Sequence, residues 1–192
     1  INPWIYDFAA YDLWSKPLGL LYLAGYLREA GFEVHYVDCL DVHRPAMIQK
    51  GAGPPPKRRR FGTGKFQREI VPKPEPLKVK DVNRRYSRYG ISPSVFQESL
   101  EAVPDPAAIL LTSLMTYWYP GVRQAISLAK AVHPRIPVIL GGIYARLCPE
   151  HALAHSGADQ IVDKAGPASL FQALYECGIL VPGEPLQKEE AP

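Results

Sequence analysis

Apolar residues along this chain fall into short strand-like runs that alternate with stripes at helical spacing. The first helical stripe lies between Pro17, which suits a first turn, and Gly31, which suits a C-terminal cap. Its members are Leu20, Leu21, Leu23, Ala24 and Leu27. The pattern predicts a helix here, followed by a strand over residues 32–38.

The rest of the chain continues this alternation after residue 92. Strands are predicted over residues 107–116, 137–142 and 158–163, and helices over residues 92–103, 120–132, 149–157 and 167–178, with Ser92 as a cap and Pro120 in a first turn. Strands that are apolar throughout and alternate with helices indicate a parallel sheet covered on both faces.

The predicted fold class is therefore α/β, with a Rossmann-like or flavodoxin-like sheet in one domain over residues 1–192. A helix before the first complete strand implies a strand upstream, and in the order 2-1-3-4-5 that strand is central. We expect Ile1 to be the tail end of this truncated first strand, and the natural protein to begin earlier.

Residues 44–92 do not fit the alternation. They are rich in proline and glycine, and we expect a long basic insertion without strong elements. Residues 50–90 hold 13 of the 22 Lys and Arg residues but only three of the 19 acids, so the remaining scaffold is acidic. This contrast favours an arm or lid lying over acidic protein surface. Residues 182–192 are expected to be a flexible tail or linker.

Composition narrows the function classes. No apolar run approaches the ~18 residues of a membrane span. Three widely spaced cysteines predict reduced thiols and a cytoplasmic location. Neither GxGxxG nor GxxxxGK[ST] occurs, which disfavours dinucleotide and P-loop sites. No Ser/His/Asp order or carboxylate pair indicates hydrolysis, so no catalytic residue is predicted.

Unusual residues follow the predicted strands, where ligands of doubly wound sheets bind. Hydroxyls beside glycines hydrogen-bond a large polar ligand, and aromatic rings cover its apolar faces. The candidate binding residues are Asn2, Pro3 and Tyr6; Thr112, Ser113, Leu114, Met115, Thr116 and Tyr117; Gly141, Gly142, Ile143 and Tyr144; and Asp163, Lys164 and Gly166.

Three stretches make the chain similar to a known family: the Pro-Leu-Gly helix start at 17–19, the turn "TSLMT" at 112–116 and Gly141-Gly142 in "VILGGIYARLCPEHAL". Together with "GADQIV" they resemble the cobalamin-binding domain of B12-binding radical SAM proteins. The resemblance covers nearly the whole chain apart from the basic insertion. It implies a Rossmann-like domain that holds the corrin and its nucleotide tail beside a barrel domain with an iron–sulfur cluster and S-adenosylmethionine.

Carried over residue by residue, the resemblance gives roles to the predicted loops. Thr112, Ser113 and Thr116 match the turn that contacts the tail, and Gly141 and Gly142 match the pair against which the tail lies. Tyr144 would flank the tail, and residues 163–166 match the last loop, although "DKAGPAS" departs from the Gly-Glu-Gly-Glu-like run of relatives.

The expected function is thus to hold cobalamin, with its base detached from cobalt, for a radical SAM-type methyl transfer or rearrangement. The [4Fe-4S] cluster and S-adenosylmethionine would bind outside this chain, because CxxxCxxC does not occur in it. A radical SAM barrel domain, in cis or in trans, is the expected partner.

Histidines offer two further hypotheses, both weaker. His43 in Asp41-Val42-His43 resembles a lower cobalt ligand, but it follows the second strand and Ala46 replaces the expected glycine. Cys148, His151 and His155 share a metal-like spacing without an evident fourth ligand, which favours helix packing over a zinc site.

Two alternative functions stay open. The run "KRRR" at 57–60, near Phe61 and Phe66, is also typical of a nucleic-acid-binding module. The same loops would also serve a small-molecule sensor or a glycosyltransferase-like half domain.

Overall fold

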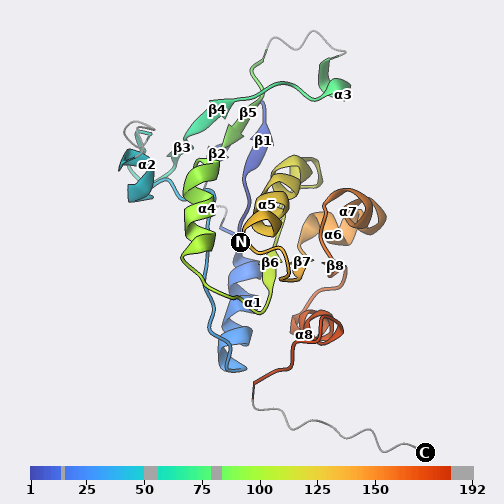
Figure 1. The fold of residues 1–192 in the computed structure, drawn as a ribbon. Helices are drawn as coiled ribbons and strands as arrows, with labels where there is room; N and C mark the ends of the chain where they lie inside the picture. Colours follow the sequence, from blue (N-terminus) through green and yellow to red (C-terminus); the bar gives the residue numbers. More distant parts are fainter. Residues whose placement is uncertain (14–15, 50–55, 79–83, 183–192) are drawn as a thin grey trace, which may run out of the picture.

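A parallel sheet forms the centre of the molecule (Figure 1). The computed structural model describes residues 1–13, 16–49, 56–78 and 84–182. Strands β6 (Ile109–Leu111), β7 (Val138–Leu140) and β8 (Gln160–Ile161) pair in that order, all parallel. The predicted α/β class with a parallel sheet is confirmed, although each strand is shorter than the apolar run that predicted it.

Residues 1–2 extend this sheet beyond β6. The Ile1 nitrogen donates to the Leu110 carbonyl, and the Thr112 amide donates to the Ile1 carbonyl. On the other side, the Asn2 amide donates to Val37 and the Cys39 amide donates to Asn2. The spatial order is therefore 37–39, 1–2, β6, β7, β8, which is the predicted order 2-1-3-4-5 with Ile1 in the central position.

The strand predicted over residues 32–38 is mostly wrong. Only its end pairs, through a single parallel bridge between Asp38 and Asn2. A strand is defined by a hydrogen-bonded neighbour, and among the described residues Asn2 is the neighbour that this segment has. Residues 32–36 consequently run alongside the sheet without a ladder.

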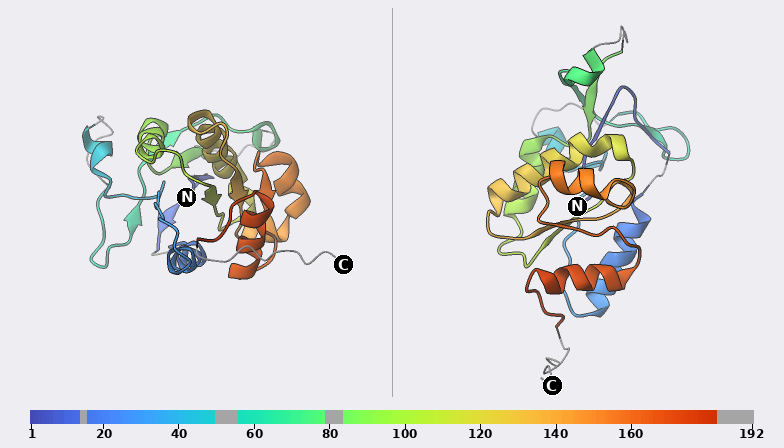
Figure 2. Two further views of the ribbon diagram at one scale, coloured as in Figure 1. Left: turned by 60° about the horizontal axis from the view of Figure 1, so that its bottom comes forward. Right: turned by 90° about the vertical axis from the view of Figure 1, so that its right-hand side faces the viewer.

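Helices cover both faces of the sheet (Figure 2). Helices α1 (Leu18–Glu29) and α8 (Pro167–Glu176) lie on one face, and α4 (Pro93–Glu101) and α5 (Tyr119–Val132) lie on the other. Shorter helices follow β7, namely α6 (Ile143–Leu147) and α7 (Pro149–His155), and a 3-10 turn, η1 (Thr116–Trp118), precedes α5. Ser92 caps α4 by accepting from the Val95 amide, as predicted.

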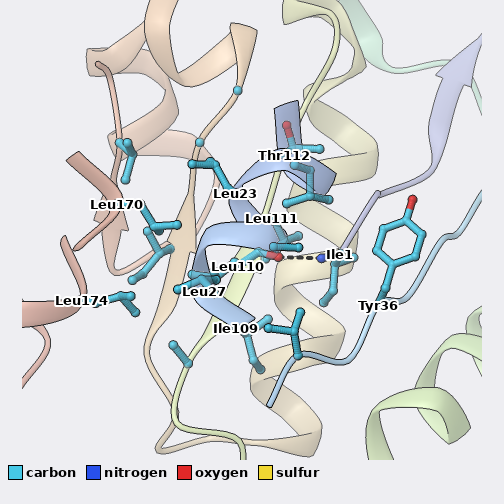
Figure 3. Close-up of a pocket in the computed structure, with 18 of the residues that line it drawn as sticks. Ile1, Leu23, Leu27, Tyr36, Ile109, Leu110, Leu111, Thr112, Leu170 and Leu174 are labelled. Carbon is cyan, nitrogen blue, oxygen red and sulfur yellow. Dashed lines mark hydrogen bonds between the residues drawn. The ribbon is translucent and has the colours of Figure 1, made fainter. Parts of the chain in front are cut away.

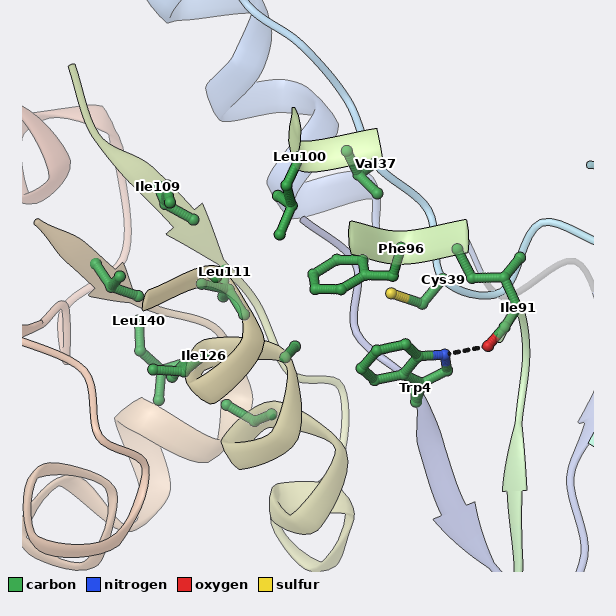
Figure 4. Packing of buried hydrophobic residues seen from close by; sticks show 14 of the residues in the cluster. Trp4, Val37, Cys39, Ile91, Phe96, Leu100, Ile109, Leu111, Ile126 and Leu140 are labelled. Atoms are coloured by element: carbon green, nitrogen blue, oxygen red, sulfur yellow. Dashed lines mark hydrogen bonds between the residues drawn. The ribbon is translucent and has the colours of Figure 1, made fainter. Parts of the chain in front are cut away.

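Alternation along the strands divides the core between these two layers. Ile109, Leu111 and Leu140 pack with α4 and α5 (Figure 4). Leu110 and Ile139 point to the opposite face and pack with the leucines of α1 and α8. Because β6 and β7 are covered on both faces, these two strands are apolar throughout, which is why the sequence pattern identified them.

The basic insertion is not the element-poor arm that the sequence predicted. Strand β5 (Ser87–Tyr89) pairs antiparallel with β1 (Ile5–Asp7) on one side and β4 (Arg68–Ile70) on the other. A second ribbon joins β2 (Tyr11–Asp12) to β3 (Gly64–Lys65), and two short helices, α2 (Pro45–Gln49) and α3 (Glu75–Lys78), complete the insertion. Residues 50–55, 79–83 and the predicted tail from 183 onward lie outside the described residues.

Charged residues of the insertion hold this antiparallel part together. Arg88 is buried, pairs with Glu69, and lies 5.6 Å from the centre of the Trp4 ring. Arg58 pairs with the buried Asp12 of β2, and this ion pair holds the chain before β3 against the β2–β3 ribbon. The insertion was misjudged because strand residues such as Ser87 and Arg88 are polar but buried.

Trp4 joins the two sheets (Figure 4). Its ring is buried edge-on against Phe96 at 4.9 Å, and its indole nitrogen donates to the Ile91 carbonyl at 2.7 Å. Gly121 of α5 lies directly against the Trp4 backbone, where a Cβ would overlap the Trp4 carbonyl oxygen and sit 2.9 Å from the carbonyl carbon. Helix α5 can therefore approach β1 only through a residue without a side chain.

No helix in the described part of the chain is long and apolar enough to span a membrane.

Substituting two helical glycines tests this close approach. Gly121→Ala is expected to lower the free energy of unfolding by about 1–3 kcal/mol, because the methyl group overlaps the Trp4 backbone. Gly25→Ala in α1 is the matched control, since its Cβ meets no atom within 4 Å. It should raise stability by up to about 1 kcal/mol through helix propensity. Urea denaturation measures both, and equal effects would contradict the packing of α5 on Trp4.

Candidate functional site

A pocket of about 780 Å³ lies against the face of the parallel sheet that α1 and α8 cover (Figure 3). Its walls are leucine side chains from both helices, and its floor is the sheet. The labelled wall residues are Leu23 and Leu27 of α1 and Leu170 and Leu174 of α8. Leu110 and Ile139 from the sheet complete an apolar interior. Such a space suits a large, flat or extended apolar group.

Loops at the carboxyl ends of β6, β7 and β8 form the rim of this pocket, so the structure brings half of the predicted residues together. The eight that line the pocket are Thr112, Ser113, Leu114, Gly141, Gly142, Ile143, Lys164 and Gly166. They come from three loops separated by more than 20 residues each. The sequence analysis could group these residues because ligands of doubly wound sheets bind at the carboxyl ends of the strands.

Gly142 lies where the loop after β7 touches the loop after β6. Its φ is +89°, and a Cβ there would lie 2.5 Å from Thr112 Oγ1 and 2.7 Å from the Ser113 amide nitrogen. The Ile143 amide also donates to the Ser113 carbonyl at 2.9 Å. Gly142 therefore lets the loop after β7 rest on the loop after β6.

Gly141 differs from its neighbour, because it faces the pocket and has room. The nearest atom to a Cβ built at Gly141 is Val162 Cβ, at 3.8 Å, which is an ordinary van der Waals distance. The fold would thus accept a side chain at this position, whereas the pocket would lose space. The two glycines that the sequence presented as one pair have separate roles, one in loop packing and one in the shape of the pocket.

The hydroxyl turn after β6 is held by its own hydrogen bonds. Ser113 Oγ donates to the Met115 carbonyl at 2.9 Å, and the Thr112 amide donates to Ile1 in the central strand position. Thr112 and Ser113 are both buried. These two hydrogen bonds fix the Thr112 backbone and the Ser113 side chain at the edge of the pocket.

The other eight predicted residues do not line this pocket. Asn2 and Pro3 line a small adjacent cavity together with Ser113 and Leu114. Met115 and Tyr117 are exposed, Thr116 is partly exposed in η1, and Asp163 is exposed beside Lys164.

Tyr6 and Tyr144 face away from the pocket. The Tyr6 hydroxyl donates to the Gln124 side chain on α5. The Tyr144 ring is buried in the α4–α5 core, and its hydroxyl lies 2.7 Å from His151 Nδ1. Burial raises the pKa of Tyr144 to about 12, so its hydroxyl stays neutral. In this structure Tyr144 supports the loop from behind rather than flanking the pocket.

Two features of the pocket were not predicted from the sequence. One is a charged residue at its rim, and the other is that leucines of α1 line it. Arg146 of α6 lines the pocket together with Lys164, which places two cations at its rim. Helix α6 was not predicted, so the position of Arg146 could not be inferred. The leucines of α1 were identified as a core stripe, yet part of that stripe lines a cavity.

The histidines of the two sequence hypotheses do not line the pocket. His43 is exposed, its amide donates to the Asp41 carboxylate, and it does not line the pocket. His151 packs edge-on against Tyr119 at 5.1 Å and lies 4.4 Å from the His155 ring. Among the described residues, no group of three or more His, Cys, Asp or Glu side chains could hold a metal ion. Cys148 instead precedes α7.

The interior of the pocket is apolar, and its rim carries hydroxyls and two cations. Cys39 does not line it; this side chain is fully buried, and burial raises the pKa of its thiol. Such an arrangement can hold a long ligand whose apolar end lies inside and whose anionic part meets the rim.

Comparison with known proteins agrees with this geometry. Residues 81–170 match the family model described as a B12 binding domain. The matched range contains the strands β5 to β8, the three rim loops and the beginning of α8. No curated protein and no solved structure matches the chain. The match supports cobalamin as the ligand, and residues 81–170 of the chain are similar to B12 binding domains.

Proposed function

We propose that this chain holds cobalamin with its nucleotide tail inserted between α1, α8 and the sheet. The base would be detached from cobalt, and the parent reaction would be a radical SAM-type methyl transfer or rearrangement. The observation that carries the proposal is the pocket itself, an apolar slot whose polar rim loops lie within residues 81–170, the range that matches the B12 binding domain.

The residues present fit the tail of cobalamin. Its aromatic base is flat and apolar, which suits the leucine walls formed by Leu23, Leu27 and Leu170. Gly141 leaves space where any side chain would intrude. The ribose hydroxyls meet a rim of Thr112 and Ser113 in this arrangement.

Charge at the rim supports the same orientation. The tail carries one phosphodiester, and Arg146 and Lys164 both line the entrance. A guanidinium and an ammonium attract a phosphate most strongly where the site is partly desolvated. We propose that these two side chains hold the phosphate while the base lies deeper.

The base-off mode follows from that placement. A base buried among the leucines of α1 and α8 cannot also bind cobalt outside the rim. The histidines that line the pocket are His35 and His133, and neither belongs to a rim loop. His133 follows α5 and bonds the Leu100 carbonyl at the end of α4. We therefore propose that no histidine of the rim replaces the base.

The surface around the entrance supports a partner domain. Met115, Tyr117 and Ile143 are 43%, 58% and 44% exposed, and Ile143 lies on the rim itself. Bound cobalamin supplies cobalt-centred methyl or radical chemistry. We propose that a radical SAM barrel domain covers this surface and provides the [4Fe-4S] cluster and S-adenosylmethionine, since CxxxCxxC does not occur in this sequence.

Nucleic-acid binding by the basic insertion stays a prediction. Arg58 and Arg88 form ion pairs within the domain, and Arg59 lies over the Tyr11 ring at 5.4 Å. These contacts give the arginines a structural role in the antiparallel part.

Reconstitution with two corrinoids tests the proposed function. The chain is mixed with hydroxocobalamin or with cobinamide, which lacks the nucleotide tail, and is then desalted. A cobalamin spectrum should stay with the protein, and cobinamide should bind at least about tenfold more weakly, because the tail supplies most of the buried contacts. Loss of both corrinoids on desalting, or equal retention of the two, would contradict tail insertion.

Filling the pocket from two sides tests its location. Leu23→Trp and Gly141→Leu each place a large side chain in the slot, and should weaken cobalamin binding at least about tenfold by titration followed in visible absorbance. The matched control for the helix is Leu21→Trp, because Leu21 lies on α1 but does not line the pocket. Circular dichroism confirms folding. Unchanged binding in both pocket variants would place the ligand elsewhere.

A further inference from the structure

The polar side chains that line the pocket lie at its two ends. One group is the rim, whose two hydroxyls and two cations lie beyond the carboxyl ends of the strands. The other group belongs to segments that lead into the strands, which places it at their amino ends. Its members are Glu33, His35, Tyr36, Asp105 and His133.

The middle part of the pocket, between these two ends, is bounded by side chains that cannot hydrogen-bond (Figure 3). They are Leu23, Leu27, Leu110, Ile139, Leu170 and Leu174. In the described parts of α1 and α8, Tyr22 is the one polar residue that lines the pocket. Tyr22 is 62% exposed, and its hydroxyl lies 3.0 Å from the Tyr26 hydroxyl, so it does not belong to the middle part.

The backbone behind these side chains is already hydrogen-bonded. Strand β7 is the middle strand of its sheet, with Ile139 opposite Leu110 on one side and Gln160 on the other. Leu27 and Leu170 lie within helices, where amide and carbonyl groups bond to one another. The helices and β7 therefore offer a ligand neither polar side chains nor free backbone groups.

This middle part is also closed to solvent. Leu27, Leu170 and Leu174 are only 6%, 4% and 3% exposed. A group that enters between them exchanges water for apolar side chains. Methyl groups and ring carbons gain from this exchange, whereas a hydrogen-bond donor or acceptor loses its water and finds no partner.

We propose that the middle part of the pocket selects the cofactor by its lower base. The chain binds cobamides, the corrinoids that carry a nucleotide tail, in preference when their base is of the apolar benzimidazole type, and it discriminates against a purine base. This proposal rests on the tail insertion proposed above. It names Leu23, Leu27, Leu170 and Leu174 as the residues that determine specificity.

The two base types differ in the groups that they would bury. Dimethylbenzimidazole carries two methyl groups and a single ring nitrogen besides the one joined to the ribose. Adenine carries an exocyclic amino group and further ring nitrogens, all of which hydrogen-bond water in solution. Between Leu27 and Leu174 these groups would stay unpaired, and each unpaired donor or acceptor weakens binding about tenfold to hundredfold.

Two cobamides and four proteins test this selection. Hydroxocobalamin and the hydroxocobamide with adenine as its base are titrated into the unsubstituted chain, Leu174→Asn, Leu23→Asn and Leu174→Met, with visible absorbance as the readout of Kd. Asparagine resembles leucine in shape but adds an amide donor and acceptor. Methionine stays apolar and is the matched control for altered packing. Leu23 is only partly buried, so its substitution perturbs folding less, and circular dichroism checks all four proteins.

The measured quantity is the ratio of the two Kd values for each protein. The free energy of detaching a base from cobalt in solution is a property of the cobamide, so it cancels when this ratio is compared between proteins. The unsubstituted chain should bind hydroxocobalamin at least about tenfold more tightly than the adenine cobamide. Both asparagine variants should reduce this preference at least about fivefold, and Leu174→Met should preserve it.

The outcomes separate this proposal from the one on which it rests. An unchanged ratio in both asparagine variants, with hydroxocobalamin still bound, would overturn base selection and leave cobalamin binding in place. The base would then lie beyond the leucines, among the polar residues at the amino ends of the strands. Failure of the unsubstituted chain to bind either cobamide would instead contradict the proposed function itself.

Discussion

Pairing of residues 1–2 with two neighbours at once is the interaction on which this fold depends. Ile1 bonds to β6 and Asn2 bonds to the segment 37–39, so these two residues connect that segment to the parallel sheet. Asn2 strengthens this junction with its side chain, which donates to Asp38 Oδ1 at 2.8 Å. The arrangement of α1 over the sheet, and hence the pocket beneath it, follows from this central position.

The antiparallel part depends on the same stretch of chain two residues later. Trp4 leaves the central position and enters the core between α4 and α5, with Arg88 over its ring. Gly90 reaches this junction with a φ of +123°, where a Cβ would lie 3.0 Å from Trp4 Cδ1. The insertion is therefore part of the structure that positions Trp4, and its basic residues are used partly for that purpose.

Sequence patterns predicted the parts of the fold in which burial is uniform. Strands β6 and β7 are apolar on both faces, and α1, α5 and α8 carry regular stripes, so their types were correct. Prediction failed where polar residues are buried through specific partners. Arg88 in β5 depends on Glu69 and Trp4, which no local pattern reveals. It failed again at 32–38, a segment that pairs with Asn2 alone among the described residues.

The loops of the candidate site could be predicted from the sheet topology. Which side chains of those loops face the pocket could not be predicted, because this depends on local geometry. Carboxyl ends of neighbouring parallel strands meet at one edge, so Thr112, Gly141 and Lys164 could be grouped without coordinates. Whether a side chain turns toward the ligand or toward the core depends on where short helices begin. Helix α6 starts directly after Gly142 and has opposite consequences for two of its residues. It buries Tyr144 against His151 and brings Arg146 to the rim. This one helix therefore explains why Tyr144 does not line the pocket and why the position of Arg146 was not predicted.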